Sequence, residues 1–322
     1  MEPSWPRGRG FIEAGRVMEI RLRALLIMLV LAGVAIPICG QETVLKPGGE
    51  DFNATELKQM MIDSAKVLDT YRFTMNIEQK MDYINYSSNE TNATKVEISS
   101  HGEGAVNLSG RKLFVSTSNE VVPVSDPEMP SQTEESKTYI INDTMYMLIQ
   151  GNWTKLSLPN ADLIWSQQNM VENQVAMMNS SVVTLLGSEK LDGDDCYMIE
   201  VVPEMSTFSS LLSEQLGSSM PVAFMNMSKL FNESDLAWTA WITKDGHFVK
   251  KSDITMAMTL TPDILGLPVE VVGDFEMNIE TKATMAYADF NEDVSIELPE
   301  EALGASPLPL YPMGMPTVEG TA

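Results

Sequence analysis

The chain has 322 residues and a formal net charge of −24, with 44% hydrophobic and 7% aromatic residues. This apolar content is sufficient for a folded core, and the excess of acidic residues argues against nucleic-acid binding, which needs a basic surface. The two cysteines exclude a disulfide-stapled mini-protein and a four-cysteine zinc site. The two histidines leave little room for histidine-based metal or acid–base chemistry.

The first 40 residues have the pattern of an export signal. Arg21 and Arg23 precede an apolar run over residues 24–36. A basic flank before such a run is typical of a secretory signal, and the run is short for a membrane span of about 20 residues. We therefore expect residues 1–40 to be a signal peptide or a lipoprotein signal. The alternatives are an uncleaved N-terminal anchor and a true start at Met18 instead of Met1.

Cys39 follows the apolar run, at the place where lipoproteins carry a lipidated cysteine. Ile38 departs from the small residue that normally precedes such a cysteine. Three outcomes stay open: lipidation of Cys39, its removal with the signal, or a disulfide with Cys196, whose geometry a sequence cannot show.

Ten of the seventeen asparagines begin an Asn-x-Ser/Thr triplet, far more than chance pairing gives. Asn-linked sugars are bulky and solubilising, so these sites should lie on the surface. With the signal, they predict a secreted or cell-surface glycoprotein on the outer face of the cytoplasmic membrane. The expected acceptors are Asn53, Asn85, Asn89, Asn92, Asn107, Asn142, Asn152, Asn179, Asn226 and Asn232.

After a linker over residues 41–53, apolar spacing predicts a helix over residues 55–69. Residues 73–83 then alternate between apolar and polar side chains, which predicts a strand with one buried and one solvated face. The clustered acceptor triplets of residues 85–95 predict a solvated loop. Further elements are expected in this order: short strands at 96–98, 104–108 and 112–116, an irregular segment at 118–136, a hairpin around 142–143, a helix at 160–178, hairpins around 192–193 and 245–246 separated by helices at 204–216 and 222–231, and a last strand at 271–287.

These elements predict an α+β fold, in which a curved antiparallel sheet, an incomplete β-barrel, wraps over helices. Each strand has one apolar face, which the sheet must cover with the helices or curl around. We expect a single domain over residues 54–300, followed by a disordered Pro/Gly-rich tail over residues 301–322.

Several short motifs follow one another in a characteristic order. They are residues 71–75 (YRFTM), 143–147 (DTMYM), 151–155 (GNWTK), 186–193 (LGSEKLDG), 196–200 (CYMIE) and 241–246 (WITKDG). This order resembles the lipoprotein-carrier superfamily, which includes the periplasmic lipoprotein localisation proteins and the LppX-like lipoproteins. The resemblance covers residues 55–300 and implies a half-barrel with an apolar cavity for acyl chains.

The side chains on the inward strand faces suit such a cavity. The chain has 24 methionines, which are unbranched and polarizable and can adapt to an irregular ligand. For a single methionine, filling the core is the simpler interpretation. By resemblance, the expected lining residues are Phe73, Met75, Ile77, Met81, Met145, Met147, Met256, Met258, Phe275, Met277, Ile279 and Met285.

The sequence contains no glycine-rich phosphate loop, zinc-binding triplet or nucleophile elbow. We therefore expect no catalysis, no cofactor and no metal site. The predicted function is binding of a lipid or other apolar small molecule by an exported glycoprotein, with membrane contact through the N-terminal signal or lipid. The alternative is a structural cell-envelope glycoprotein without a small-molecule ligand.

Overall fold

The computed structural model describes most of the chain between residues 53 and 307, and twelve strands of this part form one sheet. The described residues are 53–86, 92–125, 130–149, 151–158, 165, 170–203, 226, 229–230 and 234–307. The strands are β1 (Thr70–Asn85), β2 (Asn92–Asn107), β3 (Lys112–Pro123), β4 (Gln132–Ile141), β5 (Thr144–Ile149), β6 (Asn152–Ser157), β7 (Val182–Leu191), β8 (Asp194–Val202), β9 (Asp235–Thr243), β10 (Val249–Leu260), β11 (Phe275–Ala288) and β12 (Ser306–Pro307).

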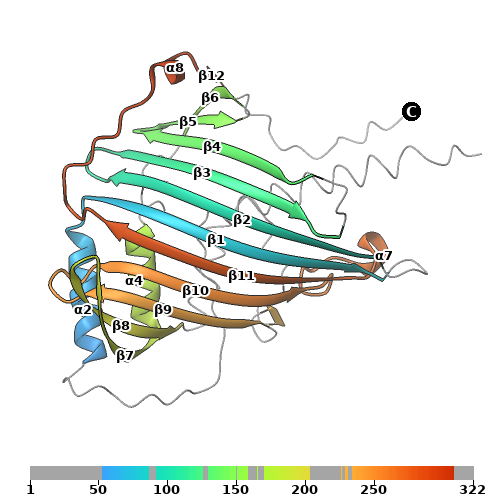
Figure 1. The fold of residues 1–322 in the computed structure, drawn as a ribbon, viewed down its shortest axis with the longest axis horizontal. Helices are drawn as coiled ribbons and strands as arrows, with labels where there is room; N and C mark the ends of the chain where they lie inside the picture. The colour runs from blue at the N-terminus through green and yellow to red at the C-terminus, as the bar shows by residue number, and fades with distance from the viewer. Residues whose placement is uncertain are drawn as a thin grey trace, which may run out of the picture.

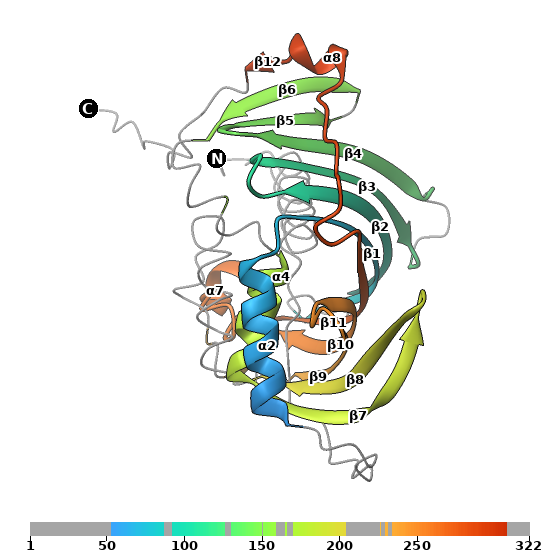
Figure 2. The same ribbon diagram turned by 90° about the vertical axis from the view of Figure 1, so that its left-hand side faces the viewer.

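The sheet consists of two antiparallel meanders that meet in its middle. Its strand order is β12-β6-β5-β4-β3-β2-β1-β11-β10-β9-β8-β7, so β1 lies between β2 and β11 (Figure 1). All pairs are antiparallel except β12 with β6. The order does not close on itself, and Figure 2 shows the sheet as an open arch.

Two helices, α2 (Ala54–Lys66) and α4 (Met170–Ser180), lie on the inner side of this arch (Figure 2). Asn53 caps α2, because its side-chain oxygen accepts hydrogen bonds from the backbone N–H groups of Thr55 and Glu56 at 3.1 and 3.2 Å. The short helices α7 (Val269–Val272) and α8 (Glu300–Leu303) follow later in the chain. In the part of the chain that is described, no helix has the length and hydropathy needed to cross a membrane. The expected α+β fold, a curved antiparallel sheet over helices, is confirmed.

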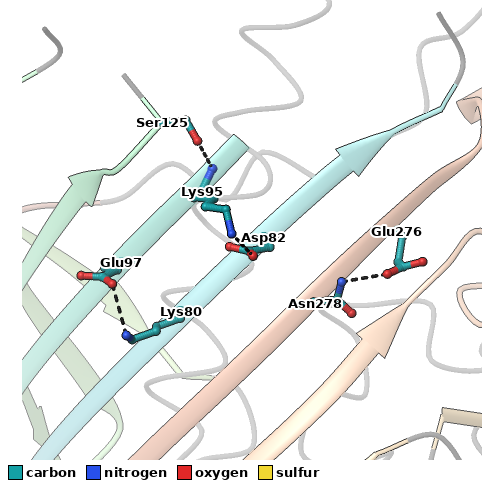
Figure 3. Close-up of polar contacts among 7 residues, drawn as sticks. All are labelled: Lys80, Asp82, Lys95, Glu97, Ser125, Glu276 and Asn278. Atoms are coloured by element: carbon teal, nitrogen blue, oxygen red, sulfur yellow. Dashed lines mark hydrogen bonds and ion pairs between the residues drawn. The ribbon is translucent and has the colours of Figure 1, made fainter. Parts of the chain in front are cut away.

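Around the central strands β1 and β11, the outer face of the sheet is polar. Lys80 and Glu97 form an ion pair across β1 and β2 at 3.4 Å, and Lys95 pairs with Asp82 on the same two strands (Figure 3). Asn278 on β11 donates to Glu276 at 2.8 Å. These polar side chains alternate along each strand with buried apolar ones. Because successive side chains point to opposite faces of a sheet, the outer face is solvated and the inner face is apolar.

The segment between β11 and β12 runs over part of the outer face as a strap (Figure 2). Val294 and Ile296 are buried there in a small cluster with Ala105, against which Phe114 and Tyr139 pack. The chain then adds β12 to β6 by parallel pairing. The strap, which we define as residues 289–305, thus partly covers the outer face and leads to the β6 edge.

Three expectations about strands and ends need correction. The short strands expected at 96–98 and 104–108 are parts of one strand, β2, and the irregular segment expected at 118–136 is mostly β3 and β4. Polar residues face inward as well as outward in β3, so its sequence shows no alternation of apolar and polar residues. One of these inward residues, Thr117, hydrogen-bonds to Ser136 on β4 at 2.7 Å. Residues 300–307, which straddle the boundary expected at 300, contain α8 and β12. The expected helices at 204–216 and 222–231 lie almost wholly outside the described residues, as does the tail from 308 onward.

Candidate functional site on the inner face of the sheet

The expected lining residues lie on one face of the sheet. The strand register places Met75 opposite Met285 and Met81 opposite Ile279, with Met258 opposite Ile279 on the next strand. Nine of the twelve are buried, and the exceptions Ile77, Met145 and Met147 are partly exposed. Ten of the twelve lie on the adjacent strands β1, β10 and β11, whereas Met145 and Met147 lie on β5.

The centre of this inner face remains partly accessible. Ile77 on β1 and its register partner Ala283 on β11 are both partly exposed, although they occupy the two strands at which the meanders meet. Thr281, the next inward residue of β11, is also partly exposed. The residues that flank these partly exposed positions along the two strands are buried. Met75 and Met285 on one side are about 5% and 4% exposed, and Met81 and Ile279 on the other side are 5% and 6% exposed. The middle strands therefore present a partly accessible apolar surface between two buried rows.

At one end of the inner face, α4 is attached by a buried polar network. The side chain of Gln174 donates to the hydroxyl of Tyr287 at 2.8 Å and accepts a hydrogen bond from Ser252 at 3.3 Å. Burial, and secondarily the neighbouring Tyr71, raise the pKa of Tyr287, so its phenol stays protonated. The rings of Tyr71 and Tyr287 contact each other edge-on, with centroids 6.0 Å apart. This network orients α4 over β10 and β11.

Sequence reasoning did not identify several polar residues of the inner face. Gln174 and Ser252 anchor α4, and Gln79 and Ser100 are buried on the inner face of the sheet. A usable signal for Gln79 was present, because it occupies an inward position in the alternation of residues 73–83 that predicts β1. No local signal marks Gln174, since its partners are more than 70 residues away in sequence.

The acceptor asparagines whose side chains are described all lie at least partly at the surface. Asn53, Asn142, Asn152, Asn179 and Asn226 are exposed, and two more, at positions 85 and 107, are partly exposed. Asn89 and Asn232 lie outside the described residues, as does the side chain of Asn92.

Asn53 and Asn179 lie close together and line a polar hollow formed by the start of α2 and the end of α4. The side-chain oxygen of Asn53 accepts the capping hydrogen bonds, which leaves the side-chain nitrogen, the site of sugar attachment, out of the cap.

Of the two cysteines, only Cys196 lies in the described part of the chain. Cys39 lies outside the described residues, together with the whole expected signal. Cys196 on β8 is buried and forms no disulfide with any described residue. Burial, and then the charge of Asp194, raise the pKa of the Cys196 thiol, which keeps it protonated and weakly nucleophilic.

The described residues do not bring together three or more His, Cys, Asp or Glu side chains that could hold a metal ion. The charged residues of the central strands β1 and β11 lie on the outer face, away from the expected lining. What the inner face offers chemically is therefore apolar contact, polarizable sulfur and a few neutral hydrogen-bonding groups.

A family model described as a family of unknown function, DUF6612, matches residues 53–307. No curated protein matches the chain. Among solved structures, LprF from Mycobacterium bovis matches with 13% identity over 76% of this chain and 96% of that chain, at a TM-score of 0.38. The lipoprotein LppX from Mycobacterium tuberculosis matches with 11% identity over 77% and 100%, at 0.35.

A LolA superfamily protein from Nitrosomonas europaea matches with 10% identity over 78% of this chain and 96% of that chain, at a TM-score of 0.20. The superfamily that the sequence motifs resemble is thus represented among the matched structures.

Proposed function

Because the chain belongs to the DUF6612 family, whose description gives no activity, we propose its function from its geometry: it binds a lipid or other apolar ligand against the inner face of its sheet. The observation that carries the proposal is the partly exposed pair Ile77 and Ala283 at the centre of an apolar face, between buried methionine side chains. Partly accessible apolar surface inside an arch is favourable for a ligand to cover, since burial of such surface stabilises the complex.

The surrounding side chains can adapt to a flexible guest. Met75 and Met285 form the row next to that pair on one side, and Met81 and Met258 lie two rows away on the other side. An unbranched thioether changes conformation at low cost, so such a surface accepts acyl chains of different shape. We propose the twelve expected lining residues as the contact surface, and we propose binding without catalysis.

The test uses the uncharged fluorophore N-phenyl-1-naphthylamine, whose emission rises in apolar surroundings. The variant Ala283→Phe adds a large ring to the centre of the inner face, whereas Ala286→Phe adds the same ring to the outer face of the same strand. We expect the wild-type protein and Ala286→Phe to bind the fluorophore and Ala283→Phe to bind it at least about tenfold more weakly, because the ring occupies the accessible surface. Equal binding by both variants, with unchanged melting temperatures, would contradict the proposal.

We also propose that the protein is exported, carries Asn-linked sugars and is located on the cell surface or secreted. Support comes from the apolar run over residues 24–36 and from the surface position of the described acceptor asparagines. Mass spectrometry of the native protein tests this directly. It reports the mature N-terminus, any lipid on Cys39, the sugar on each acceptor and any copurifying apolar ligand.

A structural cell-envelope glycoprotein without a ligand is the second candidate. The number of acceptor triplets and the net charge of −24 favour it, because sugars and like charges hydrate a surface and keep molecules apart. Native protein that carries sugars, contains no copurifying ligand and does not bind the fluorophore would support this function over ligand binding.

A further inference from the structure

Three polar side chains on adjacent strands interrupt the apolar inner face. They are Gln79 on β1, Ser100 on β2 and Asn119 on β3. Ser100 and Asn119 are register partners, and Gln79 lies diagonally across from Ser100, whose partner on β1 is Ile77. Ser100 is therefore a direct neighbour of Asn119 and a diagonal neighbour of Gln79, so one group placed beside it can reach Ser100 and one of the two amides.

Gln79 and Ser100 are buried, Asn119 is partly exposed, and all three carry a buried oxygen atom without a hydrogen-bond partner in the described part of the chain. Gln79 is 7% exposed and Ser100 is 4% exposed. Within the described part of the chain, neither the Oε1 atom of Gln79, the Oγ atom of Ser100 nor the Oδ1 atom of Asn119 has a hydrogen-bond partner. A buried polar atom without a partner destabilises a protein, so atoms of this kind call for an explanation.

The neighbouring polar groups show that such partners can be found within the sheet. The amide nitrogen of Gln79 donates to Thr281 at 3.1 Å, which fixes the amide and leaves its oxygen available. One row away, Thr117 and Ser136 hydrogen-bond to each other at 2.7 Å. The unpartnered atoms are therefore confined to Gln79, Ser100 and Asn119 in this part of the sheet. Ser100 is the register partner of the partly accessible Ile77.

The available atoms define a chemical class. The two amide oxygens require a donor, and the Ser100 hydroxyl can donate or accept. Inward positions of the described strands β1, β2, β3, β10 and β11 carry no charged residue, and the register partner of Asn119 on β4 is the exposed, acidic Glu134. An anionic head group would lose its hydration there without gaining a cation, whereas a neutral hydroxyl could donate its one proton to an amide oxygen and accept a hydrogen bond from Ser100.

On the basis of the proposed ligand binding, we propose that the ligand is an uncharged lipid bearing a hydroxyl group. Its hydroxyl donates to the Oε1 atom of Gln79 and accepts a hydrogen bond from the Ser100 hydroxyl, with Asn119 beside them, and its hydrocarbon chain lies along the methionine rows of the inner face. The cluster thus selects uncharged, hydroxyl-bearing lipids over fatty-acid anions and over pure hydrocarbons.

The test compares three ligands of equal chain length, 1-hexadecanol, palmitate and hexadecane, as competitors of N-phenyl-1-naphthylamine. We expect 1-hexadecanol to bind the wild-type protein about three- to tenfold more tightly than hexadecane, and more tightly than palmitate. The variant Ser100→Ala should lose that advantage and keep its affinity for hexadecane. The control Ser99→Ala, on the exposed side of the same strand, should bind all three as the wild type does.

The outcomes separate this inference from the proposed function. If hexadecane and palmitate bind as tightly as 1-hexadecanol, ligand binding stands and the hydroxyl site is overturned. If neither the fluorophore nor any of the three ligands binds, both are overturned. The melting temperature of ligand-free Ser100→Ala provides a second readout. It should equal or exceed that of the wild type, because the substitution removes an unpartnered buried group, and a clear decrease would show that the hydroxyl is already hydrogen-bonded and would contradict the proposed site.

Discussion

At the scale of single residues, Gln174 shows how one buried amide orients a helix. It donates to Tyr287 and accepts from Ser252, and all three residues are buried. In an apolar interior such hydrogen bonds specify one arrangement, because any displacement of α4 leaves several polar groups without partners.

We predict that Gln174→Leu lowers the free energy of unfolding by about 1–3 kcal/mol, since it removes the amide hydrogen bonds of the buried Tyr287 and Ser252 hydroxyls and leaves Tyr287 only its weak contact with the sulfur of Met285. The control is Gln59→Leu on the exposed surface of α2, where the loss of a hydrogen bond to Asp63 should change the free energy by less than about 0.5 kcal/mol. Urea unfolding of both variants measures the difference. Equal effects of the two substitutions would show that the network does not hold α4.

A second residue-scale prediction concerns alkaline pH. Because the native pKa of Tyr287 is raised, its phenol is neutral in the folded protein at a pH where an unfolded tyrosine ionises, above about 10. The contribution of Tyr287 to the free energy of unfolding is therefore complete below pH 10. It is lost as the pH rises further, at up to about 1.4 kcal/mol per pH unit. Unfolding free energies between pH 9 and 11 should fall less steeply for Tyr287→Phe than for the wild type. The partly exposed Tyr146, changed to Phe, is the control, and parallel curves for the wild type and Tyr287→Phe would contradict the prediction.

At the scale of elements, the two faces of β1 contribute differently to stability, because buried and exposed side chains alternate along it. Met81 is 5% exposed on the inner face, and its neighbour Lys80 forms an exposed ion pair with Glu97 on the outer face. Burial of an apolar side chain stabilises a fold by several kcal/mol, whereas an exposed ion pair contributes little.

We predict that Met81→Ala lowers the free energy of unfolding by about 2–5 kcal/mol and that Lys80→Gln changes it by less than about 1 kcal/mol. The two substitutions are adjacent in sequence, so strand propensity and position in the sheet are nearly matched. Denaturant unfolding at low and high salt measures both, and only the small effect of Lys80→Gln should depend on salt. A larger effect for Lys80→Gln than for Met81→Ala would contradict the assignment of faces.

At the scale of the whole molecule, the strap decides how one half of the open sheet is covered. Val294 and Ile296 are both 4% exposed against the outer face, and the chain then pairs β12 with β6. An unpaired strand edge is prone to pair with other chains, so this addition protects the β6 end of the sheet.

We predict that Ile296→Ala raises amide hydrogen exchange in β4, β5 and β6 while β8, β9 and β10 keep their protection. The substitution removes apolar contact between the strap and β2–β4 only, so the loosening should be local. Ser295→Ala, at the exposed position beside it, is the control. Uniform exchange across the whole sheet in Ile296→Ala would show that the strap supports global stability instead.

The sequence predicted α2 and the long strand β1 well, because the apolar spacing of both is clear over their whole length. It failed for β2, β3 and β4, where Gly102, Gly104 and Thr117 occupy inward positions and break the alternation. Met75 and Phe73 from β1 cover the two glycines, as a Cβ at position 102 or 104 would come within 2.4 or 2.3 Å of them. The side chain that fills such a position belongs to the neighbouring strand, so local pattern cannot reveal it.

The sequence by itself determined the composition, the export pattern, the acceptor triplets and the alternation that gives each central strand one apolar face, since all of these are local properties of the chain. Only the tertiary structure decided that β1 and β11, about 200 residues apart, lie side by side in the middle of the sheet. It likewise decided that Gln79, Ser100 and Asn119 lie close together, and that α4 is attached through Gln174. The physical reason is that register and hydrogen bonding between distant strands depend on which segments meet, and no local pattern encodes that choice.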